Sequence, residues 1–261
     1  MPGIDSQVIS MLHMDGPDGS TIFTDERGKT WTAAGNAQID TAQSKFGGAS
    51  GLFDGTGDYI DTPDHADFDV GAGDFTIDCW LKRATDGVDH YMYGQNDSGG
   101  GATNTSLQFK ILSINKLQGI FCSGGSTLTA LSTGSILTTN GWVHVAMVRY
   151  GNTVTLYING TADGTLDVTG LTCNNSAYKA AIGRPGEYTT LNFNGWIDEF
   201  RFSKGIARWT ANFTPPTEAY GLVGGNQVIL IAFKKWQGFL RDLKMGLIPP
   251  DQLRRRYGMA I

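Results

Sequence analysis

The sequence predicts an all-β fold, an antiparallel sandwich followed by a short helical arm at the C-terminus. Three observations support this prediction. Short runs alternate apolar and polar residues, glycine-rich turns separate these runs, and no helical periodicity occurs before residue 230. The 36 glycines and the 17% of charged residues suit a chain with many tight turns. A chain of 261 residues is long enough for one large sandwich core.

The clearest strand spans residues 75–81, where every second residue is apolar and these residues share one face. They are Phe75, Ile77, Cys79 and Leu81. Residues 154–158 alternate in the same way and run into Asn159-Gly160, a pair that favours the two-residue hairpin turn. We expect the returning strand at 161–168. Further strands are predicted at 8–14, 107–112, 117–121, 142–150, 180–182 and 194–203.

Net charge divides the chain near residue 221. The body, residues 1–221, carries a net charge of −10, whereas the arm, residues 222–261, carries +5. The arm repeats apolar residues at helical spacing and Pro249-Pro250 interrupts it, so we expect two short helices. The residues expected to bind a partner are Phe233, Trp236, Phe239, Leu240, Leu243, Arg254, Arg255 and Tyr257. This apolar stripe could pack on its own body, dock on a partner protein or lie on an anionic membrane.

Several classes of protein are excluded by composition. The longest apolar run, residues 228–233, is far shorter than the roughly 18–20 residues of a membrane-spanning helix. The N-terminus shows no secretory signal. The three cysteines have neither disulfide nor zinc spacing, which is typical of a protein folded in a reducing cytosol. The acidic body is a poor binder of nucleic acid, and we expect no nucleic-acid partner.

The body resembles a known family over about residues 9–216. The segments that carry the resemblance include Gly73-Asp-Phe-Thr-Ile-Asp-Cys-Trp80, Trp142-Val-His-Val-Ala-Met-Val-Arg149, Leu156-Tyr-Ile-Asn-Gly160 and Gly195-Trp-Ile-Asp-Glu-Phe-Arg-Phe-Ser203. They are similar to the laminin-G-like jelly rolls of the concanavalin A-like lectin/glucanase superfamily, in the form carried by structural proteins of tailed phages. The resemblance implies a jelly roll that recognises sugar or protein, and it names no ligand.

Catalysis is not expected. Glucanase relatives place paired carboxyls on a Glu-x-Asp-x-x-Glu strand, and this chain has no such run. It also lacks a nucleophile-elbow motif and paired metal-binding histidines. The protein is therefore predicted to be non-enzymatic.

Asp198 is the most unusual carboxylate in the sequence. Strict alternation places it on the apolar face of its strand, together with Trp196 and Phe200. A buried carboxylate must be paired, hydrogen-bonded or metal-bound. One interpretation is that Asp198 accepts N–H groups of a turn. The other is a calcium site, to which Asp15 and Asp54 would contribute; calcium is the one cofactor that we consider.

Glycan binding requires an exposed aromatic side chain flanked by planar polar groups. Two regions that read as loops fit this requirement. They contribute Tyr91, Tyr93 and Asn96 from the first, and Arg184, Glu187, Tyr188 and Asn192 from the second. The alternative for Tyr91 and Tyr93 is ordinary packing within a strand.

These observations favour a non-enzymatic surface protein of a phage virion, a capsid decoration or tail-associated subunit assembled in the host cytoplasm. The jelly roll would face outward, with surface glycans as its ligands. The arm would dock on capsid or tail proteins, and a homo-oligomer is expected. The alternative is a free carbohydrate-binding module whose arm is a structural cap.

Overall fold

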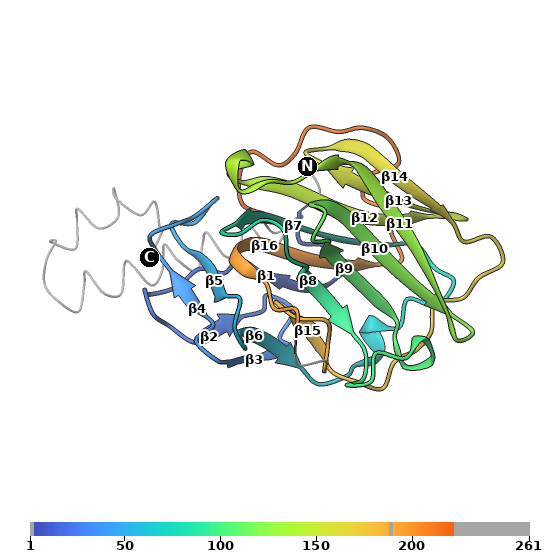
Figure 1. The fold of residues 1–261 in the computed structure, drawn as a ribbon, viewed down its shortest axis with the longest axis horizontal. Coiled ribbons are helices and arrows are strands. Elements are labelled where there is room, and N and C mark those ends of the chain that lie inside the picture. The colour runs from blue at the N-terminus through green and yellow to red at the C-terminus, as the bar shows by residue number, and fades with distance from the viewer. Residues whose placement is uncertain (1–2, 188–189, 222–261) are drawn as a thin grey trace, which may run out of the picture. The chain divides into compact units, whose positions relative to one another are not determined.

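The computed structural model describes residues 3–187 and 190–221, and the chain divides into two compact units. One unit runs from Ser6 to Tyr220, and the other combines residues 1–5 with 221–261. The first unit, which we call the sandwich, consists of two antiparallel sheets (Figure 1). The predicted all-β fold is therefore confirmed. The arm's residues lie outside the described part.

Sheet 1 is built around the central pair β7 and β16. In spatial order its strands are β14 (Thr161–Asp167), β13 (Thr153–Ile158), β12 (Val143–Tyr150), β7 (Phe75–Arg83), β16 (Asn194–Lys204), β5 (Ser50–Asp54) and β4 (Gln38–Asp40), and β1 (Val8–Leu12) also pairs with β16.

Sheet 2 packs against it and also contains eight strands. In spatial order they are β11 (Ser126–Ser135), β10 (Lys116–Ser123), β9 (Leu107–Ile111), β8 (His90–Gln95), β15 (Ala180–Ile182), β6 (Tyr59–Thr62), β3 (Thr30–Ala34) and β2 (Ile22–Thr24). Three single turns of 3-10 helix occur in the connections: η1 (Ala66–Phe68), η2 (Ala102–Asn104) and η3 (Thr138–Asn140).

The core lies between the sheets and follows the apolar alternation of the sequence. All four alternating residues of β7 are fully buried in it, as predicted. The β13–β14 hairpin also forms as predicted, because Asn159 and Gly160 both adopt positive φ, at 48° and 78°. The predicted strands at 107–112, 142–150, 180–182 and 194–203 agree with β9, β12, β15 and β16 to within one residue at each end.

Residues 90–95 form β8, although the region from Tyr91 to Asp97 was expected to be a loop, and β-bulges in β8 and β16 decide which face their side chains occupy. In β8 the register shifts between Tyr91 and Tyr93, so the two tyrosines point to opposite faces of sheet 2. In β16 it shifts between Asp198 and Arg201, with Glu199 at a φ of 51°. Ile197 therefore enters the core, and Asp198 points to the outer face of sheet 1. The prediction that Asp198 shares the apolar face is wrong.

The outer face of sheet 1 is covered by the chain's own segment 205–220. Asp78 and Arg201 stand there on neighbouring strands, fully buried, with Arg201 Nε 3.0 Å from Asp78 Oδ1. The Tyr220 hydroxyl donates to the other carboxylate oxygen of Asp78. Trp209 stacks on Phe213 with 3.9 Å between ring centroids, and both pack over the sheet. A buried ion pair thus lies beneath an aromatic cover.

Candidate functional site

The candidate site is a pocket of about 270 Å³ on the outer face of sheet 2. Its floor comes from β8 and β9, which lie side by side in Figure 1. One wall is the glycine-rich loop after β8, and the other is the connection from β15 to β16. The lining residues are Tyr91, Asn96, Gly99, Gly100, Gln108, Pro185 and Leu191. The two regions singled out from the sequence therefore meet at one site.

Register explains why Tyr91 reaches the floor. It pairs with Lys110 on β9, and the bulge that follows sends Tyr93 to the core instead. Lys110 Nζ donates to the Tyr91 hydroxyl over 2.9 Å and lies 3.1 Å from the carboxylate of Asp89. Burial by itself would lower the pKa of Lys110, but the bonds to Tyr91 and Asp89 raise it above its usual value. The lysine therefore stays charged and holds the phenol in place.

Two glycines allow the β15–β16 connection to lie directly on the sheet. A Cβ on Gly94 would lie 2.6 Å from the Cα of Pro185, which no real structure tolerates without movement. Gly186 has a φ of +99°, and a Cβ there would overlap Asn96 Oδ1 and lie 2.6 Å from the Asn96 amide nitrogen. The Glu187 amide then donates to the Asn96 carbonyl over 3.0 Å. The pocket wall is thus locked to the floor by main-chain contact.

Asn96 and Gln108 supply the polar groups of the pocket. Asn96 is 2% exposed, and its Oδ1 has no hydrogen-bond partner among the residues that the structure describes. Gln108 is 7% exposed and lies on the outer face of β9. None of the described residues that line the pocket carries a charged side chain. Two amides beside an aromatic ring can exchange hydrogen bonds with hydroxyl groups of an uncharged ligand.

The other predicted glycan residues have structural roles or lie beside the pocket. Tyr93 is fully buried and stacks on Phe200, and Tyr91 is only 5% exposed, so the prediction of an exposed ring is wrong at both positions. Arg184 pairs with Asp61 at 3.2 Å, and Asn192 donates to the Asp58 carbonyl. Glu187 is half-buried at the edge, and Tyr188 lies outside the described residues.

Gln108, Pro185 and Leu191 were not predicted as site residues. The predicted strand 107–112 already carried the signal for Gln108, because alternation with Leu107 and Phe109 turns it away from the core. Leu191 is 42% exposed, and no periodic pattern surrounds it. Only the fold brings it over β8.

Asp198 accepts two N–H groups of a turn, which is the first of its two predicted interpretations. Its Oδ2 accepts from the amides of Lys45, at 2.7 Å, and Phe46, at 3.1 Å. Burial raises the pKa of Asp198 to about 7, with the charges of Glu199 and Asp15 adding to the effect. The turn bonds lower the pKa but do not offset this.

The predicted calcium ligands do not assemble. Asp54 caps its own turn by accepting from the Thr56 amide, and Asp15 lies against Gly47 and accepts from the Ala49 amide. Among the described residues, no three His, Cys, Asp or Glu side chains form a group that could hold a metal ion.

The predicted partner-binding residues of the arm, from Phe233 to Tyr257, lie outside the described residues.

A family model matches residues 54–208 of the chain; it is the laminin G model described as the concanavalin A-like lectin/glucanases superfamily. The match covers more than half of the sequence. The chain belongs to this superfamily. Among curated proteins, none matches.

Solved structures with the same fold include two toxin domains. The binding domain of Paraclostridial Mosquitocidal Protein 1 aligns with a TM-score of 0.59 at 15% identity, over 77% of this chain and 49% of that one. The receptor binding domain of botulinum neurotoxin C/D mosaic serotype gives 0.58 at 13%, over 78% and 49%. The chain thus spans about half the length of these toxin domains.

A third likeness covers almost the whole of its counterpart. Domain 4 of AbnA, an extracellular arabinanase from Geobacillus stearothermophilus, was solved in complex with arabinotriose. It aligns with a TM-score of 0.58 at 17% identity, over 77% of this chain and 94% of that one. The superfamily fold recurs in these cases in domains that bind receptors or sugars.

Within the described ranges, no helix has the length and apolar character needed to cross a bilayer.

Proposed function

We propose that this protein is a non-catalytic glycan-binding module and that its site is the pocket on sheet 2. The observation that carries the proposal is the meeting of Tyr91, Asn96 and Gln108 in one uncharged hollow. A phenol held by Lys110 and two amides match the alternating apolar faces and hydroxyls of a sugar. The likeness to a domain solved with arabinotriose gives the proposal a first ligand to test.

The test is a titration of the full chain with arabinotriose, and with an array of uncharged glycans, followed by isothermal calorimetry. Gln108→Ala should weaken binding by up to about tenfold, the effect of one lost hydrogen bond to a neutral group. Gln118→Ala is the matched control, because Gln118 lies on the next strand, β10, outside the pocket lining. Equal losses in both variants, or no binding to any glycan, would contradict the proposed site.

We also propose that the arm, residues 222–261, attaches the body to a virion, where the glycan site would face outward. The opposite net charges of arm and body and the arm's apolar stripe support this. Deleting residues 225–261 should leave a folded body that no longer joins purified particles. Incorporation of the shortened chain at the normal level would refute the attachment role and favour the free binding module.

A further inference from the structure

We propose that the outer face of sheet 2 carries a track for a linear, uncharged polysaccharide chain, made of two hollows with a ridge between them. The glycan pocket would be one end of the track, and the β2–β3 hairpin would form the other. The inference rests on the proposed function, and it specifies the ligand as the interior of a chain rather than a single terminal sugar.

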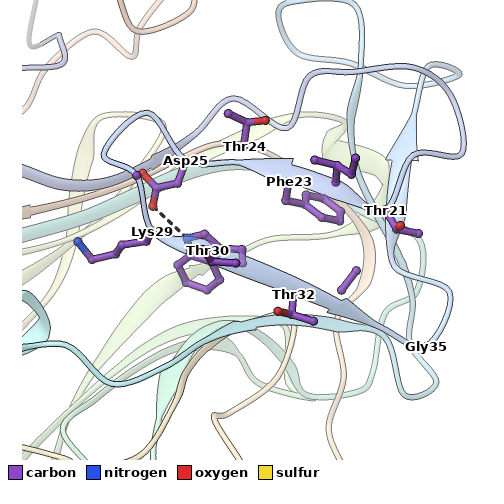
Figure 2. Close-up of a pocket in the computed structure, with 12 residues that line it drawn as sticks. Thr21, Phe23, Thr24, Asp25, Lys29, Thr30, Thr32 and Gly35 are labelled. Carbon is purple, nitrogen blue, oxygen red and sulfur yellow. Dashed lines mark hydrogen bonds between the residues drawn. The ribbon is translucent and has the colours of Figure 1, made fainter.

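The second end is a hollow of about 550 Å³ lined by both strands of the hairpin. Phe23 and Trp31 point into the core, and the alternate residues point to solvent. The exposed residues form two cross-strand pairs, Ile22 with Thr32 and Thr24 with Thr30. Figure 2 shows Asp25 and Lys29 at one end of this hollow and Thr21 and Gly35 at the other. The hollow therefore opens on the outer face of sheet 2.

Strand register connects the hollow to the pocket. Thr32 on β3 pairs with Asp61 on β6, which pairs with Ala181 on β15. Ala181 pairs with Gly94 on β8, which pairs with Gln108 on β9. One row of residues thus runs straight across five strands, from a threonine of the hollow to a glutamine of the pocket. At about 4.8 Å between strands, this row is about 19 Å long.

The ridge between the two hollows is rigid, and its two cations share one carboxylate. Arg184 Nη2 lies 3.2 Å from Asp61 Oδ2, and the guanidinium carbon lies 3.4 Å from the centroid of the Tyr59 ring. Lys179 also reaches Asp61, at 3.2 Å. Pro185 follows directly and sits on Gly94, as described above. A ligand that bridges the hollows would therefore cross side chains that these contacts hold in place.

Charge on the track favours an uncharged ligand. Only Asp25 and Lys29 among the residues lining the hairpin hollow are charged, and both are engaged within the fold. Asp25 accepts from Ser10, Arg27 and Trp31, while Lys29 donates to the Ile9 carbonyl and to Asp67. The remaining polar groups are threonine hydroxyls, which both donate and accept, as sugar hydroxyls do.

The experiment compares linear arabinose, xylose and glucose oligosaccharides of two to six units, titrated into the full chain. In the series that binds, the hexasaccharide should bind about tenfold more tightly than the disaccharide, because only the longer chain reaches both hollows. Thr24→Val with Thr30→Val should remove most of this gain and leave disaccharide binding unchanged. Thr153→Val with Thr165→Val, two exposed threonines of sheet 1, is the control and should change neither.

Two results would overturn the track. One is equal affinity for the disaccharide and the hexasaccharide, which would leave the pocket as a site for a short sugar. The other is an equal loss of disaccharide and hexasaccharide binding in the hairpin variant. If no oligosaccharide of any length binds, or if Gln108→Ala leaves the binding of every one unchanged, the proposed function itself fails, and the track fails with it.

Discussion

The outer faces of the two sheets differ in how far the chain itself covers them. On sheet 1 the chain buries a charged pair, Asp78 and Arg201, under its own segment 205–220. On sheet 2 Asp61 is also buried, but its partner Lys179 is 48% exposed, and hollows open on either side of this pair. The first face is covered by the chain itself, whereas the second carries the pocket that we propose binds a glycan. Substitutions on the two faces should therefore separate stability from binding.

The largest effect is expected at Arg201. Arg201→Ala would leave Asp78 charged and fully buried, so we expect a loss of about 3–5 kcal/mol in the free energy of unfolding. Urea denaturation followed by tryptophan fluorescence measures this loss. Glycan affinity of the remaining folded protein should be unchanged. A loss below about 1 kcal/mol would show that the cover of sheet 1 does not depend on the ion pair.

Asp198, on the outer face of sheet 1, should make the free energy of unfolding depend on pH. Its pKa of about 7 in the folded protein exceeds the usual 3.8, so the folded state holds the proton more tightly than the unfolded state. The preference of the folded state for protonated Asp198 stabilises the protein, fully below about pH 4, and this contribution to the free energy of unfolding is lost as the pH rises to about 7.

Asp198→Asn has no such titration. Its stability relative to the unsubstituted protein should rise by about 1 kcal/mol for each pH unit between these limits and then level off. Urea denaturation at pH 4.5, 6 and 8 checks this. A stability difference that stays constant with pH would contradict the raised pKa.

On the outer face of sheet 2, Gly94→Ala should separate the wall of the pocket from its floor. The new methyl group would meet the Pro185 main chain, and overpacking of this kind costs about 1–3 kcal/mol. We expect glycan binding to be lost as the connection lifts. Gly101→Ala is the control, because its φ is −70° and no atom lies within 4 Å of the added Cβ. Normal binding by the Gly94 variant would show that the wall is dispensable.

The smallest effect is expected at Lys179, whose side chain is 48% exposed. Lys179→Ala should change the free energy of unfolding by no more than about 0.5 kcal/mol, because solvent screens an exposed ion pair. Chemical denaturation of this variant beside Arg201→Ala tests the contrast between the faces directly. Similar losses in the two variants would mean that burial does not distinguish them.

The sequence predicted the strands whose apolar residues alternate, because burial on one face imposes that pattern. It did not predict β2, β3, β4, β5, β6, β8 or β11. The outward residues of β2, β3 and β11 are mostly threonine and serine, and their inward residues are few. These strands form because neighbouring strands supply their hydrogen bonds. Such long-range pairing leaves little local signal.

The candidate site was predicted only in part, and a bulge explains the main error. The region of Tyr91 and Tyr93 was expected to be a loop, whereas it forms β8, and the extra residue in this strand sends the two rings to opposite faces. The meeting of Asn96 with residues 185–191 depends on contacts across almost ninety positions in the chain, which no local pattern encodes. Gln108, by contrast, could have been found from the alternation of its own strand.

The glycine at position 94 has a consequence for how this protein can change over time. The floor of the pocket belongs to strands whose other side chains fill the core. The wall contacts that floor where Pro185 approaches Gly94, which has no side chain. The side chain of Leu191, which is 42% exposed, can therefore be exchanged without disturbing a buried ring. If the pocket binds a glycan as proposed, its ligand preference can change at this position of the wall while β8 and β9 stay unchanged.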